Sequence, residues 1–304
     1  MTYSIVARDP STGEMGVAVQ SHWFAAGGTV PFAEAGVGAV ATQAEVEESY
    51  GPRGLDFMRA GATANEALNE LLARDEQADI RQVAMVDAVG NVATHTGART
   101  IPEAGHAAGE DFSCQANMMW NATVWNAMSA AYTSGAGVLS SRLLAALDAA
   151  EGEGGDVRGR QAAGILIVGP DRLDEPWRGV RMHLRTDDHE DPLGDLRRLV
   201  ELQGAYDLME KAEELDHEGD QAGAAQSLAA ALTAAPESDE IRFWGAIALA
   251  QAGLIDAAET LLRPTFAAYP GWEELLRRLI AHKQIELTPE VAEQLLALGS
   301  GSGG

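Results

Sequence analysis

Thr2 is the residue with the clearest chemical potential in this sequence, because it follows Met1 directly and opens an apolar run that ends at Ala7. A hydroxyl is a weak nucleophile until a base lies beside it. Removal of Met1 would supply that base as the α-amine of Thr2, whose ordinary pKa of about 7.7 to 8.0 has to be lowered slightly by burial to leave the amine largely neutral. Aminopeptidases remove Met when the next residue is small, as Thr is. These residues allow two interpretations: an N-terminal nucleophile, or a Thr of no chemical importance, since Thr is common at this position.

Amide hydrolysis also needs hydrogen-bond donors that stabilise the oxyanion of the tetrahedral intermediate. Asn117, within CQANMMW, is the candidate donor, because an amide among apolar residues is buried at low cost only when it finds partners. A hydrogen-bonded core or turn Asn is the alternative interpretation.

Further polar residues stand near the ends of expected strands, and they are the candidate substrate contacts: Ser21, His22, His95, Thr96, His106, Arg160 and Gln161. In GGDVRGRQAAG, a guanidinium can hold a substrate carboxylate through two parallel hydrogen bonds. An ion pair between Asp156 and an arginine that fixes this loop is the alternative. Negative charge is expected near the entrance of the site from Glu45, Glu47 and Glu48.

The sequence contains a possible metal-binding group of residues, formed by His183, Asp187, Asp188 and His189. On a strand, positions 183, 187 and 189 share a face, which would suit a metal ion. A solvated acidic turn before the next helix is the favoured interpretation, and neither a metal nor an organic cofactor is expected. Cys114 is expected to be a small buried residue, since no base is placed beside it.

Composition narrows the class of protein. Of 304 residues, 46% are hydrophobic, and 21 Lys and Arg against 46 Asp and Glu give a net charge of −25. Such an acidic chain is not expected to bind nucleic acid or an anionic membrane. One cysteine excludes an intrachain disulfide, and no apolar run reaches roughly 18 to 20 residues. No signal peptide is expected, because Arg8 and Asp9 interrupt the first apolar run. A cytoplasmic protein is expected.

In the first 197 residues, strands alternate with helices, and these elements must position the candidate site residues. Strands are expected at 3–7, 15–21, 36–44, 164–169 and 178–188, with a hairpin over 81–97 that turns at 88–91. Two helices are expected within 51–75, where Thr63 and Glu66 suit a capping box, and a helical stretch over 123–151 with a break near Gly135 and Gly137. This order predicts an α+β fold of antiparallel sheets covered by helices.

A segment of different composition begins at about residue 198 and is rich in Ala, Leu and Glu. It contains a repeat of 34 residues, which pairs Gly219 with Gly253 and also Ala224 with Ala258, Leu228 with Leu262, and Pro236 with Pro270. This 34-residue period and the residue types at the matched positions are typical of the tetratricopeptide repeat, in which each repeat is a pair of helices. We therefore expect domains at 1–197 and 198–298, followed by a flexible tail at 299–304.

The first domain resembles the domain of unknown function 1028 family. The resemblance rests on MTYSIVARDPSTGEMGVAVQSHWFAAGGTVPFAEAGVGAVATQ, SYGPRGL, HTGARTIPEAGHAAGEDFSCQANM, GGDVRGRQAAGILIV and LRTDDHEDPLGDLRRL, in this order from residue 2 to about 200. That family is assigned to the N-terminal-nucleophile (Ntn) hydrolases, which implies a four-layer αββα sandwich with Thr2 as nucleophile. Some members carry a C-terminal extension labelled as peptidoglycan-binding, where this chain has helical repeats.

The leading hypothesis is an amidohydrolase that cleaves a small amide or peptide-like bond through Thr2, without a cofactor. A catalytically silent adaptor is the alternative; it would bind a protein partner or a cell-wall peptide through the repeats. A metal hydrolase that uses the 183–189 cluster is the third hypothesis. Exposed sheet edges and an incomplete repeat array also point to homo-oligomers.

Overall fold

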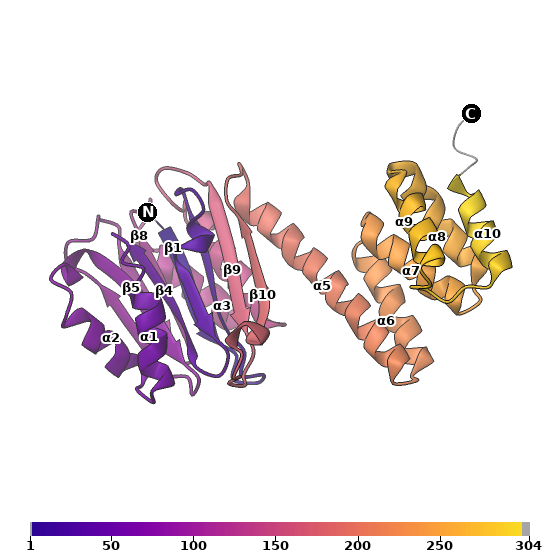
Figure 1. The fold of residues 1–304 in the computed structure, drawn as a ribbon. Helices are drawn as coiled ribbons and strands as arrows, with labels where there is room; N and C mark the ends of the chain where they lie inside the picture. The colour runs from indigo at the N-terminus through magenta and orange to yellow at the C-terminus, as the bar shows by residue number, and fades with distance from the viewer. Residues whose placement is uncertain (1, 300–304) are drawn as a thin grey trace. The chain divides into compact units, whose positions relative to one another are not determined.

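The computed structural model describes residues 2–299 and divides the chain into two compact units, with the division between Val200 and Glu201. In the first unit, the strands form two antiparallel sheets (Figure 1). Sheet A has the order β10-β9-β2-β1-β8-β7, with bounds β10 Val180–Thr186, β9 Ala162–Val168, β2 Met15–Ser21, β1 Thr2–Arg8, β8 Phe112–Asn117 and β7 Gly105–Gly109. Sheet B has the order β3-β4-β5-β6, with bounds β3 Pro31–Glu34, β4 Gly38–Ala44, β5 Arg81–Asp87 and β6 Val92–Thr96.

Helices cover the outer face of each sheet, so the unit has four layers in the order α, β, β, α (Figure 1). The helices against sheet B are α1 (Tyr50–Arg59) and α2 (Ala64–Leu72), and those against sheet A are α3 (Val124–Ser134) and α4 (Leu139–Gly152). Apolar clusters fill all three interfaces between layers. The αββα sandwich implied by the family resemblance is therefore confirmed.

The side chains of β1, in the middle of sheet A, alternate between the two faces of the sheet and pack on both. Tyr3 and Ile5 pack into the cluster beneath α3 and α4, whereas Val6 packs between the sheets. On the inter-sheet side, the polar Ser4 precedes Val6, and its hydroxyl donates to Gln43 of sheet B at 2.7 Å. Because side chains alternate along a strand, Thr2 shares the face of Ser4. The Thr2 end of β1 therefore meets sheet B through polar groups.

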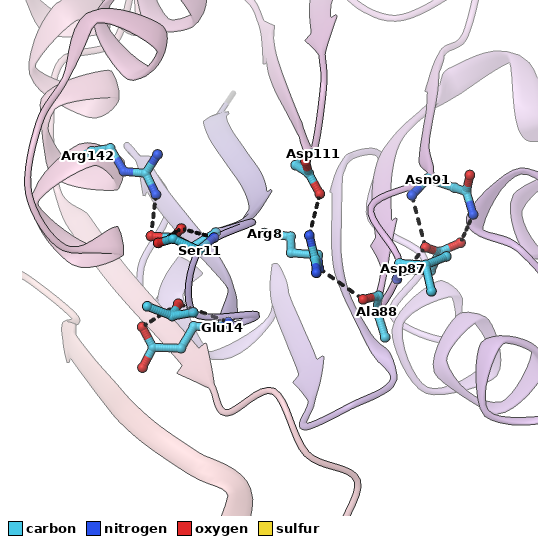
Figure 2. A network of polar contacts seen from close by, with 11 residues as sticks. Arg8, Ser11, Glu14, Asp87, Ala88, Asn91, Asp111 and Arg142 are labelled. Carbon is cyan, nitrogen blue, oxygen red and sulfur yellow. Dashed lines mark hydrogen bonds and ion pairs between the residues drawn. The ribbon is translucent and has the colours of Figure 1, made fainter.

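The opposite end of β1 is fixed by ion pairs and turn contacts (Figure 2). Arg8 donates to the carboxylate of Asp111 at 2.9 Å and, through Nε, to the carbonyl oxygen of Ala88 at 2.9 Å. Arg142 of α4 pairs with Asp9 at 2.6 Å. These contacts link sheet A to the β5–β6 turn and to α4, so β1 is held from both sides.

Local sequence signals explain the helix boundaries. Thr63 accepts a hydrogen bond from the backbone of Glu66, and the Glu66 side chain accepts from the backbone of Thr63, which completes the predicted capping box. Helix α3 ends before Gly135, and α4 begins at Leu139 after Gly137, whose φ is +93°. Both predictions from the sequence are thus confirmed.

Three strands were not anticipated from the sequence: β3, β7 and β8. Strand β7 is GHAAG, whose residue types have weak β-propensity. It forms by pairing with β8, which in turn pairs with β1. Long-range pairing stabilises these segments more than their own composition does, so local pattern missed them.

The second unit is helical. Its elements begin within α5 (Pro192–His217) and continue with α6 Gln221–Ala234, α7 Asp239–Gln251, α8 Ile255–Ala268, α9 Gly271–Ala281 and α10 Pro289–Ala297. Gly219 and Gly253 follow α5 and α7 with φ of +85° and +79°, and Pro236 and Pro270 follow α6 and α8. The 34-residue period therefore marks equivalent points of successive helix pairs, as predicted. Among the helices of residues 2–299, none combines the length and the apolar run that a bilayer crossing requires.

Candidate functional site

Thr2 lies at the end of β1 with its hydroxyl directed toward the neighbouring strand. Its Oγ1 is 3.1 Å from Oγ of Ser21, the last residue of β2, and either hydroxyl can be the donor. Thr2 is 6% exposed, and it lines a pocket with a volume of about 490 Å³. The candidate nucleophile is thus at a cavity and within hydrogen-bond distance of a second hydroxyl.

The carbonyl group of Thr2 is held by two side-chain amides. Gln43 Nε2 donates to Thr2 O at 3.1 Å, and Asn117 Nδ2 approaches the same oxygen at 3.4 Å. Both amide nitrogens also donate to Oε1 of Gln82, at 2.7 Å and 2.9 Å. All three amide residues are at most 2% exposed. The main chain of Thr2 is therefore fixed by a buried network that spans both sheets.

The network continues toward the surface through β6 and β7. Gln82 Nε2 donates to Thr96 Oγ1 at 3.0 Å, and Thr96 Oγ1 is 2.9 Å from His106 Nδ1. Desolvation lowers the pKa of the His106 imidazole, and the nearby His95 lowers it further. His95 itself contacts the carbonyl oxygen of Ala78 at 2.7 Å. Of these three sequence candidates, Thr96 and His106 are thus linked to Thr2, whereas His95 is bound to the segment that follows α2.

Apolar side chains form much of the pocket wall. Trp23 and Ile101 line it while remaining 63% and 56% exposed, so both can offer apolar surface to a bound molecule. Its charged lining residues are Glu45, Glu48, Arg99 and Arg158. The predicted acidic residues are therefore present at the pocket, but cations accompany them. Glu47 is not among the lining residues; hydrogen bonds from Ser49 lower the pKa of its carboxyl group.

Backbone strain collects around the same pocket. Ala44 ends β4 with a φ of +71°, and Met118 follows β8 with a φ of +58°; both line the pocket. A third such residue, Ala25, has a φ of +55° and precedes pocket-lining Ala26. For side chains with a Cβ this region costs of order 1–3 kcal/mol each, and such residues cluster at functional sites.

The segment after α4 supplies a buried carboxylate. Asp156 is 2% exposed and accepts hydrogen bonds from the backbone N–H of His22 at 3.1 Å and of Arg158 at 2.9 Å. Its carboxylate also pairs with the guanidinium of Arg158 at 3.2 Å. The ion pair that the sequence offered as an alternative for this loop is thus present, and its arginine lines the pocket.

The other candidates of this region have partners elsewhere. The Arg160 guanidinium pairs with Glu151 at 3.6 Å and with Asp191 at 3.2 Å, and the Gln161 amide donates to Asp188 at 3.1 Å. Neither residue is among those that line the Thr2 pocket. His22 Nδ1 is 3.2 Å from the carbonyl oxygen of Arg160, so the imidazole is turned toward this loop.

Residues that the sequence analysis did not select complete the site. Gln43 bonds the carbonyl oxygen of Thr2, Gln82 accepts from the amides of Gln43 and Asn117, and Arg158 rather than Arg160 reaches the pocket. A signal for Gln43 existed, because a glutamine in the otherwise small and apolar run GVGAVATQA needs a buried polar partner.

The possible metal cluster is not assembled in the described part of the chain. Strand β10 ends at Thr186, so residues 187–189 leave the strand on which they were aligned. Asp187 pairs with Arg185 at 3.1 Å, and the imidazole of His189 accepts a hydrogen bond from the backbone of Asp191. Across residues 2–299, no group of three or more His, Cys, Asp or Glu side chains is arranged to hold a metal ion.

Comparisons with known proteins agree with this architecture. Residues 2–196 match the family model described as "Family of unknown function (DUF1028)", and residues 217–282 match a tetratricopeptide repeat. A crystal structure of the DUF1028 protein SPO2555 from Silicibacter pomeroyi is similar, with 32% sequence identity and a TM-score of 0.59. The match covers 66% of this chain and 84% of that one. No curated protein matches the chain.

The chain therefore belongs to the family of unknown function DUF1028, and a tetratricopeptide-type repeat follows its family domain.

Proposed function

We propose that this protein is an N-terminal-nucleophile amidohydrolase that cleaves a small amide or peptide-like bond through Thr2. The observation that carries the proposal is the position of Thr2. Its hydroxyl lies at a pocket of about 490 Å³ and 3.1 Å from Ser21, while buried amides fix its carbonyl group. A fixed nucleophile beside a substrate-sized cavity is the arrangement that acyl transfer requires.

The mechanism requires cleavage of the Met1–Thr2 bond, which frees the α-amine of Thr2. The hydroxyl oxygen then attacks the amide carbon while its proton passes to the α-amine. As the tetrahedral intermediate collapses, the C–N bond breaks and the leaving nitrogen takes that proton. Water next attacks the ester on Thr2 and gives a proton to the α-amine. The bond between Oγ1 and the acyl carbon then breaks, that proton returns to Oγ1, and the acid is released. Atoms and protons balance without a cofactor.

Within this mechanism, the hydrogen bonds favour a positioning role for Asn117. Its Nδ2 faces two acceptors, Thr2 O and Gln82 Oε1. Ser21 is suited to orient the nucleophile or to carry its proton, because its hydroxyl is the side-chain group bonded to Thr2 Oγ1. Both residues act on Thr2, and their loss is expected to slow acylation.

Covalent labelling tests the proposal. An N-terminal Thr opens a β-lactone and keeps the acyl group as an ester, so the wild-type protein should gain the mass of one β-lactone probe on the peptide that begins with Thr2. Thr2→Val should abolish this label, and Thr2→Ser should restore it, because all three residues are small enough for Met removal. Thr12→Val, in the turn at the other end of β1, is the matched control. Labelling that survives in Thr2→Val would overturn the proposal.

The repeat match favours a second candidate function. Tetratricopeptide-type repeats commonly mediate protein interactions, and residues 217–282 match one. We propose a protein partner, or a cell-wall peptide, as the ligand of these helices. The full-length Thr2→Val variant separates the two candidates: an adaptor keeps its cellular role with this substitution, whereas an enzyme loses it.

A further inference from the structure

The buried carboxylate of Asp156 lies next to the candidate active site. Its side chain has no exposed surface, and it accepts hydrogen bonds from two backbone groups, the N–H of His22 after β2 and the N–H of Arg158. A backbone bridge also joins Asp156 to Met119, just beyond β8. Asp156 therefore connects the segments that flank Thr2 on both neighbouring strands.

Burial of a carboxylate is costly unless a cation and several donors compensate it. The Arg158 guanidinium provides the cation, through Nη2 at 3.2 Å and Nε at 3.4 Å. Asp156 thus contacts both the backbone and the side chain of Arg158, which favours the orientation seen in the structure. In that orientation Arg158 lines the pocket that Thr2 lines.

Other arginines nearby are held differently. Arg99 also lines the pocket, but its side chain is 72% exposed and pairs with a half-exposed carboxylate, Asp79. Arg160 lies two residues from Arg158, yet it pairs with Glu151 and Asp191 outside the pocket lining. Arg158 is therefore the pocket arginine that a buried acid orients.

We propose that Arg158 binds a carboxylate of the substrate, and that the protein acts on amides that carry one carboxylate close to the scissile bond. A guanidinium presents its N–H donors in a planar fork whose geometry matches a carboxylate, and Asp156 holds this fork at the pocket wall. This inference rests on the proposed function, because the pocket it describes is the one at Thr2.

The rest of the pocket narrows the substrate further. Trp23, Val46 and Ile101 offer apolar surface to the body of the substrate. Glu45 and Glu48 line the same pocket and repel additional negative charge. A single carboxylate on a partly apolar amide matches this lining, and a phosphorylated or polyanionic substrate does not.

Two matched probes test the inference: a β-lactone that bears a carboxylate, and its methyl ester. Wild-type protein should be labelled at Thr2 about tenfold to hundredfold faster by the carboxylate, since charge-assisted paired hydrogen bonds supply discrimination of this order. Arg158→Gln should reduce the ratio of the two rates to near one. Arg160→Gln is the matched control from the same loop and should retain the wild-type ratio.

Asp156→Asn tests the positioning role. It removes the charge and keeps an oxygen for only one of the two backbone donors, because the N–H of His22 bonds Oδ2 and the N–H of Arg158 bonds Oδ1. Labelling by the carboxylate should therefore slow while labelling by the methyl ester stays close to wild type. Arg158→Lys keeps the positive charge without the fork and should recover only part of the preference. Urea unfolding of each variant shows whether it is folded. If Arg158→Gln does not fold, Arg158→Lys replaces it in the comparison of the two labelling rates.

The possible failures can be told apart. Equal labelling of wild-type Thr2 by both probes overturns the carboxylate inference and leaves the nucleophile in place. Absence of labelling by either probe contradicts the proposed function instead. In that case, binding of 3-phenylpropionate against 3-phenylpropionamide, measured by ligand-detected NMR, still tests Arg158. A preference for the carboxylate that is lost in Arg158→Gln supports the inference, and no preference overturns it.

Discussion

The side-chain amide of Gln43 donates a hydrogen bond of 3.1 Å to the carbonyl oxygen of Thr2. It joins β4 of one sheet to the first residue of β1 in the other. The same amide bonds Gln82, and its oxygen accepts from Ser4. The position of the proposed nucleophile is therefore coupled to the packing of the two sheets.

Gln43→Met is expected to destabilise the protein and to slow acylation of Thr2. Methionine has a similar shape but leaves Ser4 Oγ and Thr2 O without this partner in the sandwich interior, which costs roughly 1 to 3 kcal/mol of unfolding free energy. Urea denaturation measures the change. Gln161→Met is the control, since Gln161 bonds Asp188 near the surface, and it should stay within about 0.5 kcal/mol of wild type. Equal effects of the two substitutions would refute the buried-network account.

Gly164→Ala is expected to disturb the pocket through the segment that follows β2. A Cβ at Gly164 would lie 2.7 Å from Cα of Gly27, in the short helix η1 (Ala26–Gly28) whose Ala26 lines the pocket. That helix must move, at an expected cost of about 1 to 3 kcal/mol, and labelling of Thr2 should slow.

A second glycine provides the contrast for this experiment. Gly204 lies within α5, and a Cβ there meets no atom within 4 Å. Gly204→Ala should raise the unfolding free energy by up to about 1 kcal/mol, because alanine favours the helix. The close-approach argument fails if thermal unfolding shows Gly164→Ala to be as stable as wild type.

The ion pair between Asp75 and Arg81 predicts a pH dependence. Arg81 bonds the Asp75 carboxylate at 2.8 Å and the backbone carbonyl of pocket-lining Glu45 at 2.8 Å. The hydrogen bond from Arg81 lowers the pKa of the Asp75 carboxyl group, so its stabilisation is present above the unfolded value of about 3.9 and is lost as the pH falls through the folded value.

Asp75→Asn should therefore cost about 3 kcal/mol at pH 7, since both side chains are largely buried. The difference from wild type should shrink as the pH falls below about 3.9, where the unfolded chain begins to bind a proton at Asp75, and it should vanish as the pH passes the lowered folded pKa. Denaturation curves at pH 7, 5 and 3 provide the check. A difference that stays constant across this range would show that charge at Asp75 is not the cause.

The fold was largely predictable because its strongest signals are local. The Thr63 capping box, the break at Gly135 and the 34-residue spacing from Gly219 to Gly253 each act within a short segment, and the structure contains all three. Strand β7 was not predictable, because GHAAG is a strand only through its pairing with β8.

In the candidate site, too, local features could be predicted from the sequence, whereas long-range contacts could not. Thr2 and Ser21 were selected as strand ends, and the pairing of β1 with β2 brings their hydroxyls together. The choice between Arg158 and Arg160 could not be made from the sequence. It depends on how Asp156 is buried against His22 and Met119, which are contributed by two other strand ends.

The central claim is that Thr2 becomes the N-terminal residue of the active protein. N-terminal sequencing, combined with the intact mass of protein purified from its native host, tests this most directly. We expect a chain that begins with Thr-Tyr-Ser and lacks the mass of one methionine residue. Native protein that retains Met1 and is still labelled by the β-lactone would contradict this claim.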